Sequence, residues 1–413
     1  MNNFFNYIGV ADIERVHSSV IAWMLSENCH AFSQTVKSKI LRKMFGVDEN
    51  NITYSKIGTQ VESDHIDIVF TTKQNDMNDM KTLWVVENKI KSLEHKVKSG
   101  KWQTEEYADK IMKKNSEGVN HFVLLSLTGE DAKSIKTKWH SLKYEELYKI
   151  FEKAERATDN NQATKRHIVI VDEYLDSLCN IIVNLQKYLK NPENFPQIFH
   201  KLPNRDKENL DNSQETNQFI LSNNLESIFQ IALYNKIVKC IKCCYDDKCE
   251  DLKEYNISGS ARNGDAEIIF KAQTIGQIGT DKITIAISFQ SGTYKIVIAA
   301  DDAYQSNDTK RWDKCLKKIC SFGIDKICED KNKCGWRYNE SKHLNNHQKP
   351  RVSITKQLSN ESNWYKKKTY QELVKIMCDG FNEALDKKKE ILRLINSEAE
   401  NKIRNEQNIE FCN

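Results

Sequence analysis

Long apolar runs are missing from this 413-residue chain. No window reaches 18 consecutive apolar residues, so we expect no transmembrane helix and no membrane partner. The first residues lack a basic segment followed by an A-x-A cleavage site, so we expect no secretory signal. We therefore predict a cytoplasmic protein whose 12 cysteines are thiols in a reducing compartment rather than a disulfide framework.

A large net charge is missing as well. The 62 Lys and Arg residues nearly balance the 58 Asp and Glu residues, which gives a formal charge of +4. This balance excludes histone-like binding by the whole surface, so any nucleic-acid surface must be local. Hydrophobic residues make up 39% and charged residues 29% of the chain, which is typical of a soluble globular protein. The length favours two domains.

Proline is scarce, and its distribution suggests where the domains meet. Three of the four prolines, Pro192, Pro196 and Pro203, lie in the polar stretch 191–216. We interpret this stretch as a linker between domains at 1–190 and 217–413. The second domain is predicted to be α+β with an antiparallel sheet, and to serve recognition, regulation or oligomerisation. Its expected helices are 217–245, 310–322 and 369–404, and its expected strands are 266–272, 282–289, 293–300 (with a hairpin turn at Gly292) and 351–356.

The most informative stretch contains two β-prone runs, 65–72 and 83–90, which predict a hairpin. Each run carries an acid among apolar residues, Asp67 in the first and Glu87 in the second. Side chains alternate along a strand, so Glu87 and Lys89 share one face. Burying bare carboxylates side by side is unfavourable unless a cation or a proton neutralises them. These three side chains therefore predict a divalent-metal site with a lysine at its edge.

The elements around this hairpin follow the order α-β-β-β-α-β. Glu14 and His17 share one face of an expected helix, and so do Gln103 and Tyr107 on a later one. The expected helices are 12–26 with Asp12 as N-cap, 32–45 ending at Gly46, the one holding Gln103, 143–155 and 166–190. Besides the hairpin, strands are expected at 52–57 and, as a buried central strand, at 121–127.

The motif D-x(19)-E-N-K, from Asp67 to Lys89, resembles the signature of the PD-(D/E)XK nuclease superfamily. E-x-x-H at Glu14 and Q-x(3)-Y at Gln103 resemble a bacterial branch of it. Ile66 stands where the signature has proline, a position that is loose in this branch. The resemblance covers roughly the first 130 residues. It implies an α/β restriction-endonuclease-like domain with an αβββαβ core, in which helices flank a mixed sheet.

The same resemblance implies Mg²⁺-dependent hydrolysis of phosphodiester bonds, with Mn²⁺ as a substitute and DNA favoured over RNA as substrate. The implied metal ligands are Asp67, Glu87, the main-chain carbonyl of Asn88, and Glu14. Lys89 would orient the attacking water and offset charge in the transition state, and Gln103 with Tyr107 would hold the strand or a phosphate. The implied context is bacterial anti-phage defence or a mobile element. A homodimer stays open.

Each assignment has a plainer alternative. Asp67, Glu87 and Lys89 could form ordinary surface salt bridges, and Glu14 could be a helix-surface acid. His17 fits a satisfied core residue better than a ligand. Gln103 and Tyr107 could lie on a solvated helix face, and Glu62 is an accessory candidate. For the whole protein, the alternative is a catalytically retired nuclease fold that binds nucleic acid or a nucleotide as a sensor.

Three further patterns leave alternatives open. A basic run that could contact phosphates or form a solvated loop comprises Lys89, Lys91, His95, Lys96, Lys98 and Lys101. Cys240, Cys243, Cys244 and Cys249 could bind zinc, but Cys240, Cys243 and Cys244 fit small hydrophobic residues on an apolar helix stripe better. Cys328, Cys334, His343 and His347 have ligand-like H-x(3)-H spacing, or form a loop. Trp312, Trp336 and Trp364 could stack on bases, or pack in the core.

Overall fold

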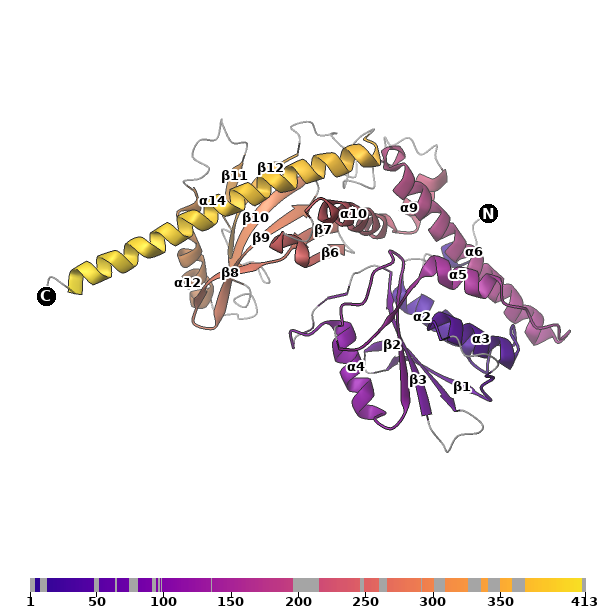
Figure 1. Ribbon diagram of the computed structural model, residues 1–413. Helices are drawn as coiled ribbons and strands as arrows, with labels where there is room; N and C mark the ends of the chain where they lie inside the picture. Colours follow the sequence, from indigo (N-terminus) through magenta and orange to yellow (C-terminus); the bar gives the residue numbers. More distant parts are fainter. Residues whose placement is uncertain are drawn as a thin grey trace. The chain divides into compact units, whose positions relative to one another are not determined.

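The computed structural model describes most of the chain in two compact units (Figure 1). The described residues are 4–7, 13–47, 52–63, 65–73, 81–90, 94–95, 97, 99–134, 136–195, 215–245, 249–259, 266–290, 292–300, 309–325, 336–340, 350–358 and 368–410. The first unit comprises 1–190, 204–233 and 258–264, and the second comprises 191–203, 234–257 and 265–413. The predicted linker 191–216 stays a prediction, since 196–214 lie outside the described residues.

The first unit is built on a mixed five-stranded sheet with the order β1-β2-β3-β4-β5. Its strands are β1 (Ile57–Ser63), β2 (Ile66–Lys73), β3 (Lys81–Lys89), β4 (Val119–Ser126) and β5 (His140–Lys143). The first three strands pair antiparallel, whereas β3–β4 and β4–β5 are parallel. The predicted hairpin 65–72/83–90 is therefore confirmed as β2–β3, and the predicted strand 121–127 as β4.

Helices cover both faces of this sheet, with α4 on one side and α2 on the other (Figure 1). The helices are α1 (Phe4–Tyr7), α2 (Glu14–Leu25), α3 (Gln34–Met44), α4 (Gln103–Lys114), α5 (Tyr144–Glu152) and α6 (Gln162–Lys190). Val85 of β3 packs in a core with Ala108 and Ile111 of α4. Trp84, on the opposite face of β3, has its ring 5.1 Å from that of Phe45 after α3. The central strand β3 is therefore apolar on both faces, and the strand predicted to be central, 121–127, is its neighbour β4.

Two expectations for this unit were wrong. The strand expected at 52–57 lies later, as β1 (Ile57–Ser63), because the main chain of Tyr54 bonds to side chains of α3 instead of to a strand. Its N–H donates to Ser38 Oγ at 3.0 Å, and its carbonyl accepts from Gln34 Nε2 at 2.9 Å. The helix expected at 12–26 is confirmed as α2 (Glu14–Leu25), but its predicted N-cap was wrong, because Ile13 is the N-cap and provides no side-chain cap. Asp12 lies outside the described residues.

The second unit contains a seven-stranded antiparallel sheet with the order β11-β12-β10-β9-β7-β6, and β8 pairs with β9. Its strands are β6 (Tyr255–Gly259), β7 (Ala266–Phe270), β8 (Gln273–Ile278), β9 (Asp281–Gln290), β10 (Thr293–Ala300), β11 (Arg337–Glu340) and β12 (Arg351–Gln357). The remaining helices of the chain are η1 (Pro192–Asn194), α9 (Glu215–Ser222), α10 (Glu226–Cys243), α11 (Glu250–Lys253), α12 (Thr309–Cys320) and α14 (Tyr370–Glu410). The unit boundary falls within α10.

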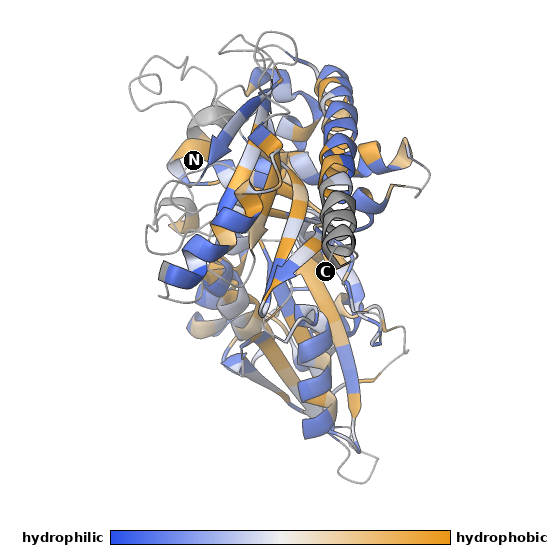
Figure 2. Ribbon diagram, turned by 90° about the vertical axis from the view of Figure 1, so that its left-hand side faces the viewer, coloured by the Kyte–Doolittle hydropathy of each residue, from blue (hydrophilic) through white to orange (hydrophobic). Residues whose placement is uncertain are grey.

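The long helix α14 packs on this sheet through a glycine. A Cβ at Gly380 would lie 2.7 Å from the ring of Tyr294 on β10, so only glycine permits this approach. The hydroxyl of Tyr294 donates to the carbonyl of Met377 at 2.7 Å and fixes the contact. Hydrophobic residues concentrate on the strands, and polar residues on the helices (Figure 2). Within the described residues, no helix is long and apolar enough to cross a membrane.

The sequence predicted the antiparallel sheet but not all of its parts. The prediction of a single helix at 217–245 was wrong. The helix is interrupted between α9 and α10 at Asn224, whose φ of 54° is left-handed. Strands β6, β8 and β11 were not predicted. The predicted hairpin turn is confirmed, with Gly292 at a φ of 72° between β9 and β10.

Candidate active site

The hairpin brings Asp67 and Glu87 side by side on the α4 face of the sheet. Ile68 pairs with Val86, so continuing the antiparallel register by one residue sets Asp67 beside Glu87. The main-chain N–H of Asn88 donates to Asp67 Oδ2 at 2.7 Å. Lys89 Nζ lies 2.8 Å from Glu87 Oε1. The alternative of ordinary surface salt bridges is excluded for this ion pair, because Glu87 is 1% and Lys89 7% exposed.

Burial dominates the electrostatics of the site. It raises the pKa of the Glu87 carboxyl to about 8, against the attraction of the Lys89 ammonium. Burial also raises the pKa of Asp67, although the hydrogen bond from Asn88 works against it. For Lys89, burial alone would lower the pKa, but the carboxylates of Glu87, Glu14 and Asp67 outweigh it and raise the pKa. The attraction of these carboxylates keeps the lysine cationic near neutral pH, and a bound cation would offset the burial that raises the pKa of Glu87.

Two buried oxygens of the site accept no hydrogen bond from the described residues, Glu87 Oε2 and Gln103 Oε1. Two adjacent carboxylates with such an oxygen fit a hard, oxygen-seeking cation such as Mg²⁺. Among the described residues, no cluster of three or more His, Cys, Asp and Glu side chains is arranged to hold a metal. In this arrangement only Asp67 and Glu87 lie side by side, so a cation here would need further oxygen ligands from other groups.

Helix α4 supplies a polar pair next to these acids. Gln103 Nε2 donates to Tyr107 Oη at 2.8 Å, as the i,i+4 spacing predicts. Burial raises the pKa of Tyr107. Gln103 is 7% and Tyr107 6% exposed, which excludes the alternative of a solvated helix face. Both lie on the α4 side of the sheet, where Tyr107 packs in the same core as Val85.

Helix α2 holds the end of β3 through Glu14. Its Oε1 accepts the main-chain N–H of Ile90 at 2.8 Å, and its main-chain oxygen accepts from Asn88 Nδ2 at 3.2 Å. Glu14 therefore connects α2 to both residues that flank Lys89, which a helix-surface acid would not do. Its role as a metal ligand stays a prediction.

The side chain of Asn88 lies on the opposite face of β3 and is fully hydrogen-bonded there. Its Nδ2 donates to Ser18 Oγ at 3.0 Å, and its Oδ1 accepts from Tyr144 Oη at 2.7 Å. Only its main-chain carbonyl is left for the predicted ligand role, which stays a prediction. His17 is 3% exposed, and its Nδ1 lies 3.1 Å from Tyr174 Oη. The prediction that His17 is a satisfied core residue is confirmed.

Sequence reasoning missed two residues that support the site. Tyr144, the first residue of α5, is buried and orients Asn88. Glu94 is 1% exposed, and its carboxylate accepts the N–H of Thr104 at 3.0 Å and that of Lys133 at 2.7 Å. It thereby fixes the start of α4, where Gln103 sits. No local signal in the sequence distinguishes either residue, because their partners are distant along the chain.

The other predicted residues near the site lie on the surface or outside the described part. Glu62 forms an exposed ion pair with Arg15 at 3.3 Å, and its left-handed φ of 54° makes the backbone irregular near the end of β1. Of the basic run, Lys101 pairs with Asp109 at 2.6 Å. Burial lowers the pKa of His95. Lys91, Lys96 and Lys98 lie outside the described residues.

The cysteines provide no metal site within the described residues. Cys240 Sγ lies 3.1 Å from Tyr370 Oη. Cys243 and Cys244 are exposed, so their expected place on an apolar stripe was wrong. The predicted cluster Cys328, Cys334, His343 and His347 lies outside the described residues, as does Trp364. Trp312 and Trp336 are buried, which favours core packing over stacking on bases.

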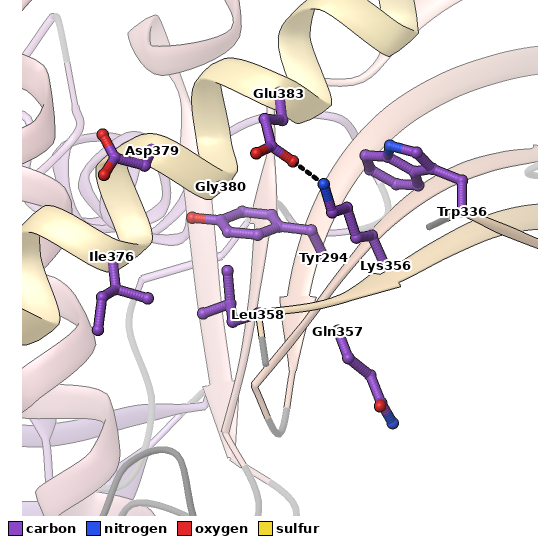
Figure 3. Close-up of a pocket in the computed structure, with 9 residues that line it drawn as sticks. All are labelled: Tyr294, Trp336, Lys356, Gln357, Leu358, Ile376, Asp379, Gly380 and Glu383. Carbon is purple, nitrogen blue, oxygen red and sulfur yellow. Dashed lines mark hydrogen bonds and ion pairs between the residues drawn. The ribbon is translucent and has the colours of Figure 1, made fainter. Parts of the chain in front are cut away.

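The second unit contains a pocket of about 280 Å³ beside α14 (Figure 3). It is lined by Tyr294, Trp336, Lys356, Gln357, Leu358, Ile376, Asp379, Gly380 and Glu383. Lys356 forms an ion pair with Glu383, which leaves Asp379 as an excess acidic charge in the lining (Figure 3). An acid-rich lining disfavours a nucleotide or another polyanion. This pocket therefore gives no support to the alternative of a nucleotide sensor.

Comparisons with known proteins agree with this geometry for the first unit. No curated protein and no solved structure matches the chain. Residues 2–175 match the family model described as the PD-(D/E)XK nuclease superfamily. The match includes the whole five-stranded sheet and every residue assigned above to the site. The first unit is therefore similar, over these residues, to the PD-(D/E)XK nuclease superfamily.

Proposed function

We propose that the chain is a metal-dependent endonuclease that hydrolyses phosphodiester bonds of DNA. The observation that carries this proposal is the ion pair of the buried Glu87 and Lys89 beside Asp67, in which one Glu87 oxygen accepts no hydrogen bond from the described residues. A purely structural ion pair has no need of a second carboxylate beside it. The match of residues 2–175 to a nuclease superfamily model supports the same reaction class.

Asp67 and Glu87 would hold the cation, with the main-chain carbonyl of Asn88 and the carboxylate of Glu14 as the further ligands that we propose. The chemistry supplied by bound Mg²⁺ or Mn²⁺ is polarisation of the scissile phosphate and a lower pKa for the attacking water. Glu87 must lose its proton to act as a ligand, because burial raises its pKa to about 8.

Lys89 supplies the positive charge of the site from the chain itself. Its pKa is raised by the neighbouring acids, so it stays an ammonium and can orient the water and offset charge on the phosphate oxygens. Gln103 can hold a phosphate oxygen through the second N–H of its Nε2, because the first donates to Tyr107 Oη. The Asn88 N–H keeps Asp67 aimed at the same point.

The substrate and context are finer proposals that depend on the resemblance. We propose DNA rather than RNA, in bacterial anti-phage defence or a mobile element in the cytoplasm, with a homodimer as an open assembly. The second candidate function is a retired nuclease fold that binds nucleic acid as a sensor. The unpartnered Glu87 oxygen favours the enzyme, because a retired site has no physical reason to keep adjacent buried acids.

A plasmid-nicking assay with Mg²⁺, with Mn²⁺ and with EDTA tests the proposal. We expect the wild-type chain to convert supercoiled plasmid to nicked or linear forms only with the metals, and Glu87→Gln to be inactive. A parallel assay on a labelled RNA of the same length separates the two substrates. DNA and RNA left intact with both metals, together with tight binding of either, would establish the sensor instead.

A further inference from the structure

Helix α12 in the second unit has one apolar and one basic face. Trp312, Cys315 and Ile319 are buried. Lys310, Lys314 and Lys317 are exposed and follow one another at i, i+4 and i+7, so they form a row along the opposite face. We call these three residues the α12 lysine row. Asp313 is the one acid among the 12 residues of the helix.

An ion pair between the half-buried Arg311 and the buried Asp281 fixes the position of this row. Arg311 Nε donates to Asp281 Oδ2 at 2.6 Å, and Arg311 Nη2 contacts the other oxygen of the same carboxylate. Asp281 is the first residue of β9 and is 2% exposed, and the guanidinium beside it lowers its pKa. A paired fork of this kind has fixed geometry. The row is therefore presented from a rigid element rather than from a loose surface helix.

The active-site helix α4 has a different charge balance. It carries three lysines and three acids, and those acids also pair with Lys101, Lys110 and Lys136. Its side chains therefore contribute little net attraction for a polyanion. In α12, Asp281 balances Arg311, and the four lysines of the helix face its single acid, Asp313. Of these two helices, α12 is the one with a net positive charge.

The dimensions of the row suit a nucleic-acid backbone. Seven residues of helix span about 10 Å, and a DNA duplex presents roughly six phosphate charges over that length of its axis. A lipid surface would need an outward apolar stripe for insertion. In α12 that stripe is already buried. Charge complementarity without exposed apolar surface therefore favours a nucleic-acid backbone over a membrane.

We propose that the α12 lysine row contacts the phosphate backbone of the DNA substrate. This inference deepens the proposed nuclease function and relies on it for the identity of the substrate. Because contacts to the DNA backbone carry no sequence information, the α12 lysine row would contribute affinity rather than sequence specificity.

The test is DNA binding by the full chain in EDTA, where no cleavage interferes. We expect Lys310→Gln/Lys314→Gln/Lys317→Gln to weaken the affinity for a fluorescent 30-base-pair duplex by at least about 10-fold. The slope of log K against log salt should become shallower by about 0.9 for each phosphate that the variant no longer neutralises. The matched control, Lys239→Gln/Lys375→Gln/Lys389→Gln, removes the same charge from exposed lysines of α10 and α14 and should change the affinity less than about 2-fold.

The outcomes separate this inference from the proposed function. Equal reductions in DNA affinity for both triple variants, or no reduction for either, would overturn the proposal that the α12 lysine row contacts DNA. Binding of the wild type to anionic phospholipid vesicles that is abolished in the α12 variant, with DNA binding intact, would overturn it in favour of a membrane. A selective loss of DNA binding by the α12 variant supports the proposed backbone contact, whether or not the wild type cleaves plasmid. Failure of the wild type to cleave plasmid counts only against the proposed nuclease function. Lys314→Glu, a single change at an exposed site, replaces the triple variant if that one misfolds.

Discussion

The ammonium of Lys89 lies 2.8 Å from Oε1 of Glu87, two positions earlier on the same strand, and both side chains are buried. Among the described residues, none donates a hydrogen bond to the second oxygen of that carboxylate. Lys89 therefore engages one oxygen of Glu87 and leaves the other to a bound cation. This arrangement has measurable consequences for stability, metal binding and catalysis.

The stability of the metal-free protein should depend on pH through Glu87. Burial raises its pKa from 4.5 to about 8, so between these values the folded protein keeps a proton that the unfolded chain has released. Stability should therefore fall as pH rises through this window. Glu87→Gln cannot titrate, so its denaturation midpoints in EDTA should fall less between pH 5 and pH 8. An equal fall of the midpoint with pH in wild type and variant would contradict the raised pKa of Glu87. Glu62→Gln, at an exposed acid, is the control and should behave like the wild type.

Lys89→Met should abolish cleavage while leaving DNA binding intact. Removing the ammonium takes away the charge that faces the developing phosphate charge, which lowers kcat by at least about 10²-fold. Steady-state kinetics in Mg²⁺ would measure the effect. Lys101→Met, in an exposed pair with Asp109, is the matched control and should keep nearly full activity. An unchanged kcat with a raised KM would instead identify Lys89 as a binding residue.

Glu14→Gln should distinguish a ligand from a structural acid. The amide oxygen can still accept the Ile90 N–H, so the hydrogen bond at the end of β3 survives while the negative charge is lost. As a ligand, Glu14 predicts Mn²⁺ affinity at least about 10-fold weaker by calorimetric titration, with little change in melting temperature. Unchanged Mn²⁺ affinity would leave Glu14 a structural acid. Glu62→Gln, which loses only an exposed pair with Arg15, should bind Mn²⁺ like the wild type.

Tyr144→Phe should destabilise the protein by about 1–3 kcal/mol, because the buried Asn88 Oδ1 loses its hydroxyl donor. Asn88 also donates to Asp67 through its main chain, so kcat should fall with little effect on KM. Tyr148→Phe, on the same helix with an exposed bond to Glu152, should change neither quantity. Urea denaturation and steady-state kinetics check both variants. A loss of stability without any loss of kcat would show that Tyr144 has a structural role only.

The sequence predicted the parts of the site that local spacing encodes. Asp67, Glu87 and Lys89 follow from alternation along two strands, and Gln103 with Tyr107 from helical periodicity. Tyr144 and Glu94 could not be found this way, because their partners lie 56 and 10 or more residues away. The misplaced first strand has the same cause. Tyr54 looks β-prone, but its main chain is taken by side chains of α3.

Both faces of strand β3 are used. Glu87 and Lys89 face the candidate catalytic centre, and Asn88 bonds to the helices on the opposite face. Inserting or deleting one residue before Glu87 would turn the acid and the lysine toward those helices and the asparagine toward the substrate. A substitution in β3 keeps the direction of the other side chains, whereas an insertion or a deletion reverses it. New target preferences would therefore arise more readily by remodelling the surroundings of this strand than by lengthening or shortening it.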